Sequence, residues 1–104
     1  MSIVYFKGTF ASDEEAKISV RTHAFNYGTA IFEGIRGYWN QEKKQLFVLH
    51  MDRHYKRMKE NASILMFPFP YNVKELSKLT IELLRKNNHK EDVICSERFL
   101  FLDE

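Results

Sequence analysis

One segment of the chain, residues 23–36, gathers side chains suited to binding a small anionic molecule. Tyr27 and Phe32 provide flat apolar surface, and the Tyr27 hydroxyl adds a hydrogen-bonding group. Gly34 lets another group approach the backbone closely. The Arg36 guanidinium is a planar fork of donors that suits a carboxylate or a phosphate. Together these residues predict one wall of a small-molecule pocket.

The same segment also has plainer explanations. Phe25, Ile31 and Phe32 would equally suit a hydrophobic core, and Gly28 and Gly34 would suit turns. Glu33 has the chemistry of a general base, but no acid partner is evident, so an exposed or salt-bridged carboxylate is favoured. Composition alone supports the pocket and the core about equally.

A second candidate cluster lies at residues 50–58. Arg53 and Arg57 are four positions apart, as are His50 and His54, so each pair shares one face of a helix. An arginine on a helix that follows a buried strand can present its fork to a phosphate. Spacing alone favours a solvated basic face, by about two to one. The two histidines lack evident further ligands, so we predict no metal site.

Composition narrows the class of protein. The chain has 104 residues, enough for one domain, and 44% of them are hydrophobic, so it can bury a core. Sixteen basic and 14 acidic residues give a net charge of +2, which provides no basic face for nucleic acid. Cys95 is the single cysteine, and no signal peptide or membrane-spanning run is evident. These features predict a cytoplasmic protein that binds neither nucleic acid nor membrane.

Apolar periodicity predicts the elements that must position these residues. Strands are expected at residues 3–6, 9–10, 17–20, 35–39 and 46–49, with a short helix at 29–33. One main helix is expected over residues 52–65, with its buried face formed by Tyr55, Met58, Ala62 and Leu65. The result is an α+β fold in which a small antiparallel sheet packs against two main helices.

The second main helix has a clear start signal. Asn72 is a good N-cap, and Glu75 lies where a capping box requires it; the helix should end near residues 87–88. Strand material follows at residues 93–94 and 99–102. The sequence then stops in an apolar stretch, so we expect a piece of something longer.

Residues 23–36 closely resemble the signature of branched-chain amino acid aminotransferases, which are pyridoxal-phosphate (PLP) enzymes of fold type IV. The resemblance continues through residues 54–58 and 61–65 and covers roughly residues 3–93. The related D-amino acid aminotransferases and aminodeoxychorismate lyases look similar. Residues 27–29 and 32–36 resemble the branched-chain group most.

The resemblance implies a role for several residues. Arg57 matches the arginine that holds the cofactor phosphate. Phe32 and Gly34 match residues that line the pocket for the substrate side chain, and Arg36 matches a position that supports the site. Tyr27 matches a tyrosine that reaches the pocket of the neighbouring subunit, so a homodimer is implied.

The implied reaction moves an amino group from leucine, isoleucine or valine to 2-oxoglutarate, so the implied partners are branched-chain amino acids and 2-oxo acids. The family's Schiff-base lysine lies well beyond residue 104, and no lysine here matches it. We therefore expect residues 1–104 to be the N-terminal small domain, without a catalytic residue of its own, inactive alone and at most a weak binder of PLP. One alternative is the chemistry of the related D-amino acid aminotransferases or aminodeoxychorismate lyases. The other is a truncated, non-catalytic module for dimerisation or binding.

One short segment departs from the family pattern. Where the family has a strand of the type Tyr-Ile/Val-Arg, this chain has Cys95, Ser96, Glu97 and Arg98. Arg98 is out of register with the family's carboxylate-binding arginine. We hypothesise a local disturbance of the reading frame, which resequencing of the gene would test; a clean read with Cys95 in frame would contradict it.

Overall fold

The computed structural model describes residues 2–100, and the side chains of residues 2–95. The elements follow in the order β1 (Ile3–Phe6), β2 (Thr9–Ser12), α1 (His23–Tyr27), β3 (Ala30–Asn40), β4 (Gln45–Val48), α2 (Met51–Ile64), α3 (Val73–Asn87) and β5 (Val93–Leu100). Antiparallel strands and helices make up the molecule, so the predicted α+β class is confirmed.

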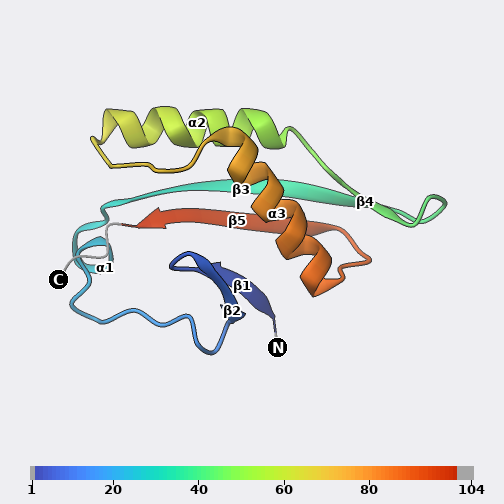
Figure 1. Cartoon of the computed structure of the whole chain (residues 1–104), viewed down its shortest axis with the longest axis horizontal. Helices are drawn as coiled ribbons and strands as arrows, with labels where there is room; N and C mark the ends of the chain where they lie inside the picture. The colour runs from blue at the N-terminus through green and yellow to red at the C-terminus, as the bar shows by residue number, and fades with distance from the viewer. Residues whose placement is uncertain (1, 101–104) are drawn as a thin grey trace.

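Strand β3 is the centre of a three-stranded antiparallel sheet with the order β4-β3-β5 (Figure 1). On one side, β5 pairs with it from Ala30 to Gly37. On the other side, β4 pairs only with its last part, from Gly37 to Asn40. Within the described residues, no strand therefore covers residues 30–36 of β3 on the side of β4.

Side chains along β3 alternate strictly between two environments. Ile31, Glu33, Ile35 and Gly37 are buried, and we call them the inner face. The residues between them, which we call the outer face, are exposed: Phe32, Gly34, Arg36 and Tyr38. This alternation follows from the pleat of a strand, which sends successive side chains to opposite sides.

The inner face packs against α2, which lies alongside β3 in Figure 1. The buried cluster comprises Ile31 and Ile35 from the strand with Tyr55, Met58 and Ala62 from the helix. The three helix residues follow the predicted spacing, so the predicted core face of this helix is confirmed for them.

Helix α3 is fixed to its neighbours by polar contacts. Its Thr80 hydroxyl donates to the Leu76 carbonyl at 2.8 Å and hydrogen-bonds the buried Tyr55 hydroxyl of α2. At its other end, the Asn87 side chain bonds both the amide and the carbonyl of Ile3, at 2.8 Å each. The Asn87 contacts join the separate β1–β2 hairpin to the rest of the fold.

The predicted start of α3 is also confirmed. The Asn72 side chain accepts a hydrogen bond from the Glu75 amide at 2.8 Å, as an N-cap does. Its amide group donates to the Glu75 carboxylate at 2.6 Å. The helix ends at Asn88, whose left-handed φ of 51° stops it one residue after Asn87.

Several expectations about local structure are wrong. The short helix predicted at residues 29–33 is part of β3, and the nearby helical turn is instead α1, at residues 23–27. Both faces of β3 carry apolar side chains here, which hides the strand period. Residues 17–20 form no strand, because no neighbouring strand pairs with them.

Two further details differ from the expectation. The strands form two sheets and not one, and Leu65 lies just past the end of α2, half exposed and outside the core. The predicted strand material at residues 93–94 and 99–102 is one strand, β5, as far as Leu100; residues 101–102 lie outside the described residues.

Candidate functional site

The predicted pocket segment begins with α1, a short helix that presents Tyr27 outward. The helix ends at Gly28, whose φ of 69° favours glycine. His23 Nδ1 lies 2.8 Å from the Thr29 hydroxyl oxygen, and this contact closes the turn between α1 and β3. The Tyr27 ring lies against the His23 ring, with centroids 4.7 Å apart, yet Tyr27 is 75% exposed.

The outer face of β3 brings three of the predicted substrate-binding residues together. Phe32, Gly34 and Arg36 follow one another on this face, and Phe32 is 74% exposed. A Cβ added to Gly34 would find its nearest described neighbour 4.0 Å away, at a methyl group of Ile94, which is an ordinary contact distance. The alternative of a plain core role holds for Ile31, which is buried, and not for Phe32 or Phe25.

Arg57, predicted to hold a phosphate, lies on α2 and therefore on the inner side of the sheet. Its Nε donates to Glu33 Oε2 at 2.7 Å and its Nη2 donates to Oε1 at 2.6 Å. His54, one helical turn earlier, places Nδ1 2.6 Å from the same Oε1. We call these three residues the Glu33 cluster. The structure thus separates Arg57 from the outer-face residues by the thickness of β3.

Within the Glu33 cluster, Glu33 and Arg57 form an ion pair. Glu33 is only 3% exposed, but the hydrogen bonds from Arg57 lower the pKa of its carboxyl below the usual value of 4.5, outweighing the effect of burial. The carboxylate in turn raises the pKa of Arg57. Because an ionised carboxylate only accepts hydrogen bonds, the proton between His54 and Glu33 belongs to His54 Nδ1.

Arg57 keeps donors for another partner. A guanidinium has five N–H groups, and two of those of Arg57 go to Glu33. The others make no hydrogen bond to the described part of the chain, and the side chain is 63% exposed. A permanent cation that is held on one edge and open on the other suits a phosphate dianion.

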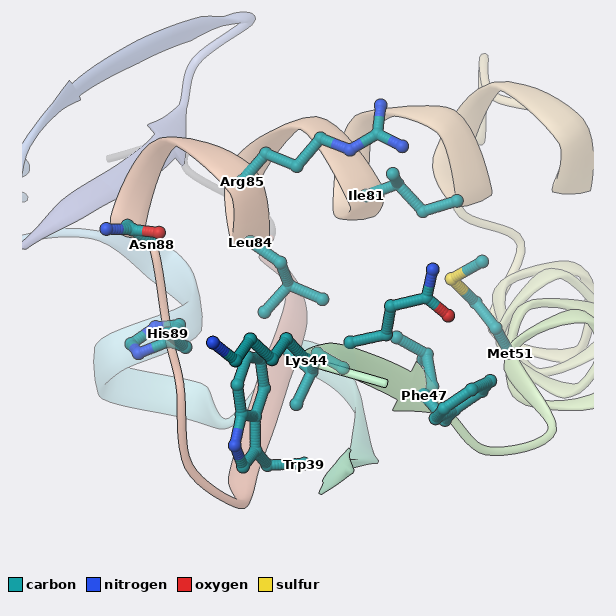
Figure 2. Close-up of a pocket in the computed structure, with 12 residues that line it drawn as sticks. Trp39, Lys44, Phe47, Met51, Ile81, Leu84, Arg85, Asn88 and His89 are labelled. Carbon is teal, nitrogen blue, oxygen red and sulfur yellow. The ribbon is translucent and has the colours of Figure 1, made fainter. Parts of the chain in front are cut away.

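A cavity of about 560 Å³ lies elsewhere, between β4 and the second half of α3 (Figure 2). Trp39 and Lys44 come from the β3–β4 hairpin, and Leu84 and His89 from α3 and the residues after it. None of the predicted site residues lines this cavity. The candidate site predicted from the sequence is therefore separate from this cavity.

Two members of the Glu33 cluster had no assigned function at the sequence level. The salt-bridged state of Glu33 is confirmed, but its burial and its contact with His54 were not foreseen. A detectable signal existed: Glu33 lies two residues from Ile31 and two from Ile35, so a strand places its charge on a buried face.

Two other features are absent from the described part of the chain. No group of three or more potential metal-ligating side chains gathers there. None of its helices combines the length and apolar character that a membrane crossing needs.

The fold that carries these residues, a small antiparallel sheet covered by helices, matches solved branched-chain aminotransferase structures. The chain superimposes on the crystal structure of the Escherichia coli branched-chain amino acid aminotransferase with a TM-score of 0.90 and 30% identity, covering 98% of this chain and 33% of that one. The Thermobaculum terrenum enzyme in its PLP form matches with a TM-score of 0.79 and 29% identity, over 86% of this chain and 29% of that one.

Sequence comparison agrees with the structural match. A probable branched-chain-amino-acid aminotransferase of Aquifex aeolicus is 48% identical over 103 residues, which is 99% of this chain and 33% of that protein. No protein-family model matches the chain. The chain is therefore a relative of the branched-chain aminotransferases, as its resemblance implied, and it spans about a third of the length of the relatives it matches.

Proposed function

We propose that this chain forms part of the active site of a PLP-dependent branched-chain aminotransferase, which moves an amino group from leucine, isoleucine or valine to 2-oxoglutarate. The observation that carries the proposal is the 48% identity over 103 residues, a span that includes every candidate site residue. We further propose that the protein acts in the cytoplasm as a homodimer, to which Tyr27 contributes across the subunit boundary.

The open edge of β3 supports this assignment. Side chains from both faces of a strand flank its edge, and residues 30–36 have no paired strand on the side of β4 within the described chain. A molecule bound along this edge would meet Phe32 and Gly34 from one face and Arg57 from the other. In this arrangement Phe32 and Gly34 favour a branched aliphatic substrate side chain, and Arg36 supports the site.

The donors of this chain fit the phosphate end of PLP. Arg57 offers a permanent positive charge with an exposed edge, as a phosphate monoester requires. When bound, PLP supplies an electron-withdrawing ring that makes the α-proton of an amino acid acidic. We propose that the lysine that moves this proton is supplied by a part of the protein outside these 104 residues, in keeping with the greater length of the relatives.

The outer face also favours a second candidate, a non-catalytic dimerisation or binding module. Phe32 is 74% exposed, and Ile94, which pairs with Arg36 farther along the same face of the sheet, is 66% exposed. Exposed apolar patches often mark contact surfaces. A module of this kind would use the same face to bind a second copy of the chain without any chemistry.

An assay with three substrates tests the proposal. The protein produced from its intact gene, supplied with PLP, should form glutamate from L-leucine and 2-oxoglutarate, and the 104-residue chain alone should not. Turnover of D-alanine or of aminodeoxychorismate in place of L-leucine would instead assign the chemistry of the related enzymes. No turnover of any of the three, together with a stable dimer, would establish the non-catalytic module.

A further inference from the structure

We propose that Glu33 is a positioning residue, whose buried carboxylate aims the open edge of Arg57 at a phosphate. This inference rests on the proposed function, because the phosphate meant is that of the cofactor. It assigns to Glu33 and His54 a task that packing alone does not require.

The burial of Glu33 is the first argument. It is 3% exposed and lies on the inner face between two buried isoleucines, Ile31 and Ile35. Removing a carboxylate from water is unfavourable unless it is paired, and an apolar side chain would fill the same place at lower cost. The charge of Glu33 therefore serves to orient a partner side chain, and packing of the core does not require it.

The geometry of the pair is the second argument. Arg57 is bound side-on, through Nε at 2.7 Å and Nη2 at 2.6 Å, which fixes the plane and the rotation of the guanidinium. An exposed arginine without such a partner samples many rotamers, and binding a ligand would have to order it. The edge left open comprises both N–H groups of Nη1 and the second N–H of Nη2.

His54 holds the carboxylate from a second side. Its Nδ1–H donates to the oxygen that also accepts from Arg57 Nη2, so Glu33 Oε1 is fixed between two donors. His54 and Arg57 are three residues apart on one face of α2. One side chain of α2, that of His54, thus holds the Glu33 carboxylate in place. The carboxylate in turn orients a second side chain of the same helix, that of Arg57.

The first experiment observes Arg57 itself, by nitrogen-15 NMR of its Nε–H group in the 104-residue chain. We expect slow hydrogen exchange of this group, faster by at least about tenfold in Glu33→Gln. The matched control is Glu60→Gln. It removes a negative charge, as Glu33→Gln does, but at an exposed position one helical turn from Arg57. Unchanged exchange in Glu33→Gln would overturn the positioning role.

The second experiment titrates the same variants with inorganic phosphate and follows the Arg57 signals. By Coulomb's law alone, loss of the negative charge of Glu33 should tighten phosphate binding. Positioning predicts the opposite sign, a weakening of about tenfold or more in Glu33→Gln, with no weakening in Glu60→Gln. Equal or tighter binding in Glu33→Gln would contradict the proposal.

The two experiments separate the inference from the function on which it rests. If Glu33 holds Arg57 but phosphate never shifts the Arg57 signals in the wild-type chain, the proposal that Arg57 binds phosphate fails. The finding that Glu33 orients Arg57 is then retained. If phosphate binds at Arg57 equally well in wild type and in Glu33→Gln, the site stands and the positioning role of Glu33 fails. Thermal unfolding of each variant shows whether the fold is retained.

Discussion

The two faces of strand β3 share one backbone and differ in almost everything else. Ile35 on the inner face is 0% exposed, and Phe32, three residues earlier on the outer face, is 74% exposed. The inner face meets α2 and contributes the core, while the residues of the outer face are exposed. A strand of period two thus separates residues that hold the fold from residues that are available to a ligand, within a single segment.

The largest expected effect comes from the inner face. Ile35→Ala should lower the free energy of unfolding by about 2–5 kcal/mol, because it removes buried methyl groups and leaves a cavity beside Tyr55 and Met58. On the outer face, Phe32→Ala should change it by no more than about 0.5 kcal/mol, since its ring is already in water. Urea unfolding monitored by circular dichroism measures both values. Equal losses in the two variants would mean that the faces are not distinct.

The glycines of β3 sharpen the same comparison without removing any side chain. A Cβ on Gly37, on the inner face, would meet Val93 at 3.0 Å and Leu46 at 3.3 Å, whereas the nearest described neighbour of one on Gly34 is a methyl group of Ile94 at 4.0 Å, an ordinary contact distance. Gly37→Ala should therefore destabilise the fold by about 1–2 kcal/mol. Gly34→Ala should be neutral or stabilising by up to about 1 kcal/mol, because alanine loses less backbone entropy than glycine. A destabilised Gly34→Ala variant would show that the outer face is covered.

Lowering the pH should have a smaller and reversible effect on the stability contributed by the inner face, through protonation of Glu33. The pKa of Glu33 is lower in the folded chain than its usual value of 4.5, so its contribution to stability is complete above that value. It is lost as the pH falls through the lower, folded value, because protonation breaks the pairing with Arg57. The difference in unfolding free energy between wild type and Glu33→Gln should therefore shrink from neutral pH toward about pH 3. A pH-independent difference would show that the ion pair does not stabilise the fold.

The sequence was most informative where one period or one cap dominates. Helix α3 was predicted almost to the residue, because Asn72 and Glu75 mark its start unambiguously. The core face of α2 was predicted because a helix with one apolar stripe must bury it. In both cases a local pattern was sufficient, and no knowledge of the neighbouring elements was needed.

The predicted strand at residues 35–39 lies within β3, but the same approach failed for residues 29–33, because the two faces of the strand there are both apolar for different reasons. Ile31 is apolar because it is buried, whereas Phe32 is apolar on an exposed surface, so the alternation that identifies a strand is masked. The predicted site residues Phe32, Gly34 and Arg36 do share one face. That Arg57 would lie behind the strand, bound to Glu33, depends on how α2 packs, which is a tertiary contact that local pattern cannot supply.

Removing the charge of Arg36 on the outer face should have the smallest effect on the stability of the fold. This substitution tests whether the outer face is available for binding. Arg36 is exposed, and within the described residues its side chain makes no ion pair. Arg36→Gln should change the free energy of unfolding by no more than about 0.5 kcal/mol. In the protein made from its intact gene, the same variant should lower kcat/KM for L-leucine, because the supporting charge at the site is lost. A variant that unfolds more easily by over about 1 kcal/mol would instead make Arg36 a structural residue, and the contrast between a structural inner face and a binding outer face would no longer hold.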